Sequence, residues 1–230
     1  MHRIKRHLKV WMTASLLIYG VFAGTTPSFA GSLEFRFIGN MAFQISDGAF
    51  TILTDYPYIS GAFGYMEYQS ETVKPVGTVL SLVTHEHDDH WNPASFRKAP
   101  GWSLVGPAGV TGSVDPNRVI HVDETAQFGP ATILVHQTPH SDLVHYSYVV
   151  IWQGVRMFFS GDTNSSKELL AEKDLDVAFV SPWLLNQLRA SGRRVDAKMV
   201  VVYHHGVDEQ ITVYQDCLVP VQGEEFTVAR

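Results

Sequence analysis

One short segment constrains this chain more than any other. After an apolar run at residues 79–83, residues 84–90 read Thr-His-Glu-His-Asp-Asp-His, so three imidazoles and three carboxylates fall within six residues. Neither the 3.6-residue period of a helix nor the two-residue period of a strand places all of them on one face. The pattern therefore predicts a buried strand that ends in a loop wrapped around cations.

The donor types in this segment indicate which cations it holds. Imidazole nitrogen and carboxylate oxygen together suit zinc, iron, manganese or nickel, and zinc is the usual choice for hydrolysis. The alternative is a solvated polar loop, which seldom carries the order His-x-His-x-Asp-His directly after an apolar strand. The two acidic residues at the x positions are expected to face outward or to support the ligands. The candidate ligands in this segment are His85, His87, Asp89 and His90.

Three later apolar runs are also followed by a candidate ligand. They are 132–136, followed by His140; 155–159, followed by Asp162; and 199–203, followed by His204. A lone residue of this kind is usually a turn residue, but three at strand ends indicate loops gathered on one rim of a scaffold, where functional residues commonly lie. Two choices stay open, because His145 competes with His140 and His205 competes with His204.

The remaining pattern predicts the fold class. The chain has 230 residues, 45% hydrophobic and 17% charged, which is an ordinary globular balance for one domain. Strands in the majority, interleaved with helices, favour two packed sheets with helices outside over a single sheet that binds dinucleotides. Helices are expected from Pro93, at 165–171 and at 182–190. Strands are expected at 33–38, 42–46, 50–54, 79–83, 102–105, 119–122, 132–136, 146–152, 155–159, 177–180, 199–203 and 226–228.

Residues 1–30 have the three-part pattern of a secretory signal peptide. A basic start precedes an apolar run at 10–23, and the small-x-small sequence at 28–30 precedes Gly31. The alternative is a retained membrane anchor, but the run is short for a bilayer span, which needs about 20 residues. We expect cleavage, a mature chain of residues 31–230, no stable membrane association afterwards, and a secreted or periplasmic location in a bacterium.

The charge balance limits the partners. Residues 1–30 contain four of the 17 basic residues and none of the 23 acidic ones, so the mature chain has 13 basic residues and a formal charge of −10. Binding to nucleic acid or to an anionic membrane needs net or local positive charge. We therefore expect a small-molecule substrate and no nucleic acid. The single cysteine, Cys217, permits no intramolecular disulfide.

Several of these motifs resemble one family. Residues 84–90 match the His-x-His-x-Asp-His signature of the metallo-β-lactamase superfamily, and residues 161–163 resemble the later Gly-Asp-Thr element of its hydrolases. Residues 37–40 with 54–55 resemble the opening of the branch similar to ascorbate-6-phosphate lactonase, in which an early Gly and a later Asp flank the first hairpin. The first motif is highly specific, and the others occur in the right order. The resemblance covers nearly all of residues 33–228.

The resemblance implies an α+β fold, an αββα four-layer sandwich with two divalent metal ions, zinc by expectation, at the sheet edges. His140 has the family-like spacing to the next strand, and His204 is the first residue after its own strand. By this resemblance, the first metal would be held by His85, His87 and His140, the second by Asp89, His90 and His204, and Asp162 would bridge both.

The implied function is that of a secreted metal-dependent hydrolase, in which a hydroxide bound by two metals attacks an ester, lactone, thioester or phosphodiester. Asp89 would be catalytic, orienting the hydroxide and carrying a proton to the leaving group. β-Lactamases of the superfamily with two zincs have Cys or Ser in place of Asp162. Cleavage of a β-lactam therefore ranks lower, and a secreted β-lactamase is kept as the alternative enzyme. A periplasmic metal-binding protein without turnover is the non-enzyme alternative. The aromatic segment 56–68 is interpreted either as a wall of the pocket or as a packed surface loop.

Overall fold

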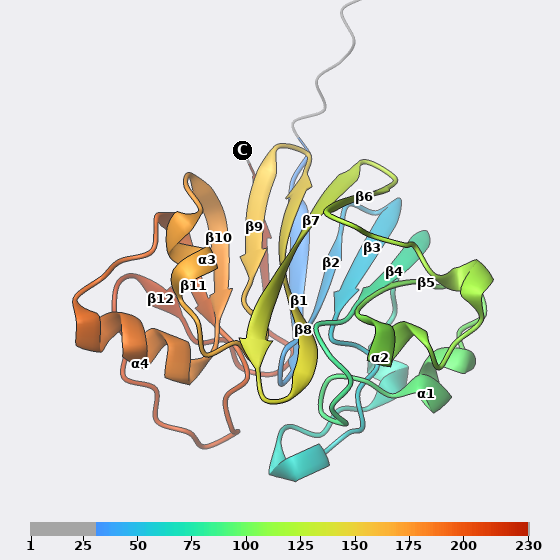
Figure 1. Ribbon diagram of the computed structural model, residues 1–230, viewed down its shortest axis with the longest axis horizontal. Helices are drawn as coiled ribbons and strands as arrows, with labels where there is room; N and C mark the ends of the chain where they lie inside the picture. Colours follow the sequence, from blue (N-terminus) through green and yellow to red (C-terminus); the bar gives the residue numbers. More distant parts are fainter. Residues whose placement is uncertain (1–30, 230) are drawn as a thin grey trace, which may run out of the picture.

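The computed structural model describes residues 31–229, and the predicted signal peptide at 1–30 lies outside the described residues. Two sheets pack face to face with helices on the outside (Figure 1). The predicted α+β sandwich is therefore confirmed. None of the helices within residues 31–229 has the length and hydrophobicity that crossing a membrane requires.

The first sheet has six strands in the order β13-β1-β2-β3-β4-β5. Pairing is antiparallel from β13 to β3 and parallel from β3 to β5. Because β1 and β3 both run antiparallel to β2, their carboxyl ends reach the same edge. The bounds are β1 (Leu33–Gly39), β2 (Ala42–Ser46), β3 (Phe50–Thr54), β4 (Thr78–Leu82), β5 (Ser103–Val105) and β13 (Glu225–Val228).

The second sheet has seven strands in the order β12-β11-β10-β9-β8-β7-β6. Strands β9 to β12 are parallel, and β7 runs in the direction of β9 because both pair antiparallel with β8. The bounds are β6 (Thr125–Phe128), β7 (Ala131–His140), β8 (Leu143–Trp152), β9 (Val155–Phe159), β10 (Leu175–Val180), β11 (Ala197–Val202) and β12 (Cys217–Leu218).

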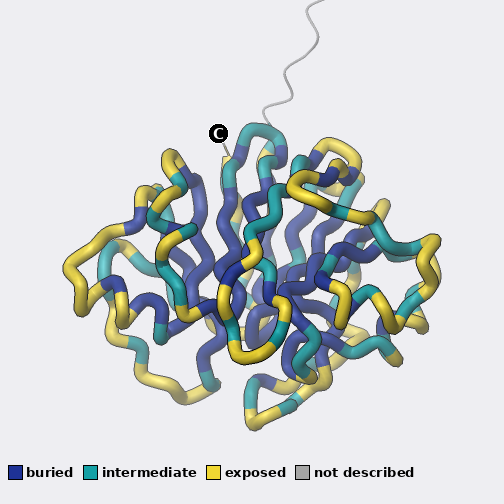
Figure 2. Tube along the Cα trace, viewed as in Figure 1, coloured by how far each residue is buried: buried dark blue, intermediate teal, exposed yellow. Residues whose placement is uncertain are grey.

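The main core lies between the two sheets, where the inward-facing residues of both are apolar. Phe179 of β10 is fully buried at its centre. Its ring stacks on Phe159 with centroids 4.5 Å apart and meets Phe43 of the opposite sheet edge-on at 4.9 Å. The buried trace in Figure 2 runs through the strands of both sheets, while the exposed trace lies mostly in the loops. Burial of apolar area between the sheets is thus the main stabilising term.

The outer face of the second sheet is covered by α3 (Lys167–Ala171) and α4 (Pro182–Ser191). Helix α4 begins where the Ser181 hydroxyl accepts the Leu184 N–H, with Pro182 in the first turn, and ends at Gly192 in a left-handed conformation. Its leucines pack against the outward-facing residues of β10 and β11. The second helical layer of the sandwich lies on the outer face of the first sheet.

The outer face of the first sheet is covered in two parts. The short helices α1 (Pro93–Arg97) and α2 (Ala108–Thr111) pack on β5 through Phe96 and Val110. The rest is covered by the loop 55–77, whose Tyr56 and Tyr58 are buried against this sheet. Part of the aromatic segment is therefore a packed surface loop, as one of the two interpretations held.

Several element boundaries differ from the sequence prediction. The strand expected at 119–122 is wrong: Val119 forms only an isolated bridge with Leu104, after a 3-10 helix that begins at Pro116. Strand β7 runs on to His140, because the polar segment 137–140 pairs with β8. Helix α3 starts two residues later than expected. Strands β6 and β12 and helix α2, each of four residues or fewer, were not predicted.

Replacing Phe179 by Ala tests the core. We expect a loss of about 3–5 kcal/mol in the free energy of unfolding, because a large buried ring leaves a cavity between the sheets. Urea denaturation of both proteins measures it. The matched control is Phe63→Ala, whose side chain is 72% exposed; it should change stability by no more than about 0.5 kcal/mol. Equal effects of the two substitutions would contradict this description of the core.

Candidate metal centre

The candidate ligands lie at one edge of the sandwich, where the carboxyl ends of several strands meet. In the first sheet β4 leads into residues 83–92, and in the second β7, β9 and β11 lead to the other candidates. These strand ends and their loops lie at the lower edge in Figure 1. Loops at the carboxyl ends of parallel strands are a common position for a ligand site.

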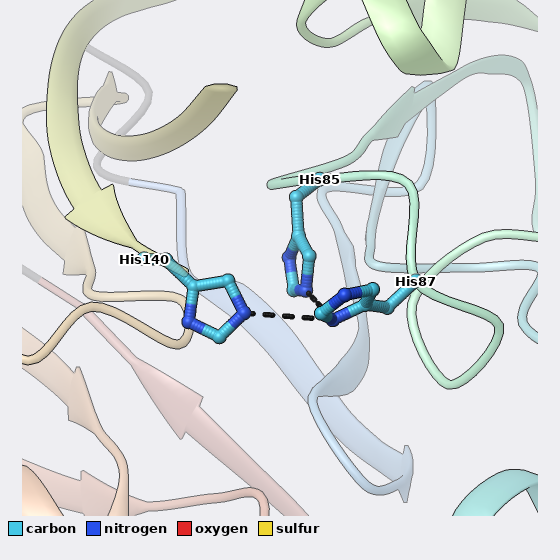
Figure 3. Close-up of side chains that lie close together, drawn as sticks. All are labelled: His85, His87 and His140. Carbon is cyan, nitrogen blue, oxygen red and sulfur yellow. Dashed lines mark hydrogen bonds between the residues drawn. The ribbon is translucent and has the colours of Figure 1, made fainter. Parts of the chain in front are cut away.

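Three histidines form the first group (Figure 3). His85 Nε2 lies 2.9 Å from His87 Nδ1, which lies 3.5 Å from His140 Nε2. The Nδ1 of His140 lies 3.0 Å from the Asp162 carbonyl, and the Nδ1 of His85 lies 3.1 Å from the Thr84 hydroxyl. When each Nδ1–H donates to its oxygen, the Nε2 lone pair is left facing the group.

Asp89, His90 and His204 form the second group, and all three are buried. The carboxylate Oδ2 of Asp89 lies 3.4 Å from His90 Nε2 and 3.3 Å from His204 Nε2. The other ring nitrogen of His90 faces the carboxylate of Asp55 at 3.3 Å, so its Nε2 can present a lone pair. This is an oxygen–nitrogen donor set of the kind that divalent metals accept.

Asp162 lies between the two groups. Its Oδ1 is 3.3 Å from His90 Nε2 and 3.2 Å from His204 Nε2, whereas its Oδ2 is 4.0 Å from His140 Nε2. A further set of potential ligand atoms, from His85, His90 and Asp162, joins the two. All seven residues predicted from the sequence are thus brought together, and one carboxylate faces both groups.

The two competing histidines are engaged elsewhere. His145 Nε2 accepts the Asp162 N–H at 2.9 Å, and its Nδ1 lies 2.8 Å from the Thr138 hydroxyl. The nitrogens of His205 face two carbonyl oxygens, of Gly206 at 3.1 Å and of Pro220 at 3.2 Å. Both rings therefore serve the protein scaffold, and neither points a nitrogen into the groups described above.

The two acidic residues between the ligands, Glu86 and Asp88, differ in their surroundings. Asp88 is exposed. Glu86 is partly buried, and its carboxyl group fills the space that a side chain at Gly109 of α2 would need. Glu86 therefore connects the ligand loop to α2 rather than facing solvent.

Asp55, Thr84 and Asn40 support the ligands, and they were not among the predicted site residues. The Asp55 carboxylate accepts the Thr84 N–H at 2.7 Å and its hydroxyl at 3.0 Å. Asn40 donates to the Asp89 carbonyl at 2.7 Å, and its own carbonyl accepts the His204 N–H at 2.7 Å. Asn40 thus fixes the two halves of the second group relative to each other, as hydrogen-bonded supports of metal ligands do.

Left-handed backbone is concentrated at this edge. Asn40, Asp55 and His204 have φ of 52°, 41° and 58°, values uncommon for residues other than glycine. Gly161 has φ 58°, and a Cβ there would lie 2.3 Å from His145 Nε2, so only glycine fits. Such strained positions cluster at functional sites. In the sequence, the motif of Gly39 and Asp55 on either side of the first hairpin was the only indication of these supporting residues.

The charges of the site balance one another. Burial lowers the pKa of His85 and keeps its ring neutral. Burial also opposes the charges of His90 and Asp162, but their mutual attraction outweighs it, raising the pKa of His90 and lowering that of Asp162. In the same way, despite burial, the pKa of His204 is raised and that of Asp89 is lowered. Protons on imidazoles thus offset buried carboxylates here, and bound cations could take over that role.

Unpartnered atoms support the fit of cations to this donor set. His90 Nε2, His204 Nε2 and Asp162 Oδ1 are buried without a well-directed hydrogen bond, although each ring nitrogen lies 3.2–3.3 Å from the Asp162 oxygen. Buried polar atoms are nearly always hydrogen-bonded, so three such atoms pointing at one another need an explanation. A cation between them would satisfy all three.

Aromatic rings border the two groups. Tyr65 lies edge-on to His204 with ring centroids 4.2 Å apart, and Trp183 of α4 does so at 5.0 Å. Phe63 lies edge-on to His87 at 6.4 Å. The second half of the aromatic segment therefore borders the site, as the other interpretation held, while its first half packs on the sheet. Trp183 was missed because nothing in its helix pattern marked it.

Comparison with known proteins identifies the family and the fold. Residues 34–182 match the model of the β-lactamase superfamily domain. A UPF0173 metal-dependent hydrolase from Deinococcus radiodurans is 26% identical over 167 residues, covering 64% of this chain and 71% of the relative. The structure of Igni18, a metallo hydrolase from Ignicoccus hospitalis, superposes with a TM-score of 0.69 at 17% identity, covering 86% of this chain and 99% of that one.

A metal-dependent hydrolase structure from Parabacteroides distasonis gives a TM-score of 0.59 at 20% identity and covers 78% of this chain and 84% of that one. At these identities the structural matches establish the fold. The family match spans more than half of the chain, which therefore belongs to the β-lactamase superfamily. Metal-dependent hydrolases of the metallo-β-lactamase fold are the class to which it is related.

His145→Gln tests the surroundings of the site through pH. Burial lowers the pKa of His145 to about 3, so between pH 5 and 6 the unfolded chain binds a proton there that the folded chain does not. Stability of the metal-free protein therefore rises with pH, and Gln should reduce this slope by about 1 kcal/mol per pH unit. Urea titrations with chelator across this range measure it.

His121→Gln is the control, because it makes the same change at an exposed position. Its slope should equal that of the wild type. An unchanged slope in the His145 variant would contradict the buried, neutral state of that ring.

Proposed function

We propose that this protein is a metal-dependent hydrolase with two divalent cations, zinc by preference, in the centre described above. His85, His87 and His140 would hold one, and Asp89, His90 and His204 the other. The observation that carries the proposal is the position of Asp162, whose two carboxylate oxygens face different groups. A carboxylate so placed suits a bridge between cations about 3.5–4 Å apart.

Such a pair of cations supplies two things: it lowers the pKa of water toward neutrality and it stabilises negative charge on a carbonyl or phosphoryl oxygen. The chain's own residues prepare this chemistry. The Thr84 hydroxyl and the Asp162 carbonyl orient His85 and His140. Asn40 holds Asp89 and His204 in register. The rigid support keeps the donors close to their working positions without further reorganisation.

Asp89 is proposed as the catalytic carboxylate. Its Oδ2 is within 3.4 Å of both histidines of its group, and it is buried. In the metal-free chain, contacts with those histidines keep the pKa of Asp89 below its usual range despite burial, so Asp89 is ionised at neutral pH. Bound cations would keep it ionised in their place. Asp89 would then orient the attacking water and deliver the proton to the leaving group.

The substrate has an ester, lactone, thioester or phosphodiester bond under this proposal. The centre has an aspartate at position 162, where β-lactamases with two zincs would have Cys or Ser, so β-lactam cleavage ranks lower. A protein that binds metal without turnover would share every ligand. We also keep as proposals the secretory signal at residues 1–30, a secreted or periplasmic location, and the kinship with ascorbate-6-phosphate lactonase.

Substitution of the bridging residue tests the function. Zinc-loaded wild type should contain two equivalents of metal by elemental analysis, and Asp162→Ala should lose at least one because both groups lose a donor. Hydrolysis of p-nitrophenyl esters, lactones, thioesters and phosphodiesters should fall at least about 100-fold for the best of these substrates. Wild-type metal content and activity in this variant would contradict the proposal.

Two pairs of neighbouring histidines provide matched controls. His204→Ala should lose metal, whereas His205→Ala should keep two equivalents, and the same contrast should separate His140→Ala from His145→Gln. Full metal with no turnover on the whole panel would favour the non-enzyme alternative.

A further inference from the structure

Phe63 is an exposed aromatic residue held in a strained conformation at the metal centre. Its side chain is 72% exposed, and its backbone is left-handed with φ 53°. Gly61 and Gly64, also with positive φ, flank it. An exposed ring and a left-handed non-glycine residue are both unfavourable in isolation. Strain of this kind is common at functional sites, and here the ring lies edge-on to His87.

The other ligand group has an aromatic border as well. Tyr65, two residues along the same loop, lies against His204 on one side, and Trp183 lies against it too. The Trp183 indole donates to the Thr163 carbonyl at 3.2 Å, which fixes its plane. One loop therefore places an aromatic ring beside a ligand of each group.

Two of the segments that carry candidate ligands also have an exposed apolar residue. Val144 is 42% exposed in the hairpin that begins after His140, and Val207 is 76% exposed three residues after His204. Exposed apolar residues on the segments that carry a site are compatible with contact to an apolar group.

The segments that carry the seven candidate ligands contain no basic residue that could bind an anion. Within four residues of the seven candidate ligands the sequence has no Lys or Arg. The ion pairs of Lys and Arg among residues 31–229 all involve acidic residues elsewhere. Carboxylate and phosphate groups are recognised mainly by Arg and Lys. The other acidic residues within four positions of those ligands are Glu86, Asp88, Asp142 and Asp208.

From the aromatic border and the lack of basic residues we infer the substrate class: an uncharged carboxylic ester, lactone or thioester with an apolar acyl group that lies against Phe63 and Tyr65. The inference rests on the proposed function, since it concerns the substrate of the same centre. Among the four bond types considered above, it selects the neutral carbonyl compounds over phosphodiesters, whose extra negative charge would meet acidic loops.

Binding of hydroxamates to zinc-loaded protein, measured by calorimetry, tests this without turnover. A hydroxamate binds metal through its head and leaves its chain to the protein. Octanohydroxamate should bind about tenfold or more tightly than acetohydroxamate, because several methylenes leave water. The eight-carbon analogue that ends in a carboxylate should bind no more tightly than acetohydroxamate.

Phe63→Asn provides the specific test, because asparagine tolerates the left-handed backbone. It should weaken octanohydroxamate binding by about tenfold and leave acetohydroxamate unchanged. The control is Val76→Asn, on the same loop with a 46% exposed side chain, in the part that bonds to Thr51 of β3. It should behave as wild type.

The outcomes separate the two proposals. If acetohydroxamate binds but chain length has no effect, or if Phe63→Asn keeps the full preference for the long chain, the inferred substrate class is overturned while the metal centre stands. A tighter complex with the carboxylate-ended analogue overturns it equally. If no hydroxamate binds to protein supplied with zinc, the proposed function fails together with this inference.

Discussion

The whole arrangement depends on how buried charge is compensated at one sheet edge. Two aspartates and several histidines are removed from water there, which is costly unless opposite charges or cations face them. Asp89 and Asp162 lie within 3.4 Å of imidazole nitrogens of His90 and His204. The sandwich satisfies this constraint because its carboxyl strand ends meet at that edge.

The scaffold meets the constraint by connecting its two sheets through the site itself. Asn40, directly after β1, bonds to the loop after β4 and to His204, the second residue after β11. Asp55 after β3 orders Thr84, which in turn faces His85. The strained backbone at Asn40, Asp55 and His204 is tolerated because several hydrogen bonds hold each segment, and the aromatic core behind it is rigid.

Local patterns, apolar runs with donor residues directly after them, predicted two packed sheets and the segments that carry the candidate ligands. The four-layer sandwich and the set of seven ligands were implied by the family resemblance, and the patterns alone left His140 against His145 and His204 against His205 open. The sequence could not predict that residues 119–122 form no strand, since their apolar pattern resembles one and only the single bridge between Val119 and Leu104 forms. Asn40 was missed as a support because its role depends on contacts 49 residues along the chain. Trp183 was missed as a neighbour of His204 because tertiary packing alone brings the two together, whereas Tyr65 belongs to the aromatic segment for which a place in the pocket wall was one of two interpretations.

The central claim is that the chain holds a pair of cations between these donors. A crystal of the zinc-loaded protein, measured at the zinc absorption edge, tests it most directly. We expect two anomalous peaks about 3.5–4 Å apart, one beside His87 and one beside His204, with the Asp162 carboxylate between them. A map with no peak at this edge, or with a single peak bound by His145 or His205, would contradict it.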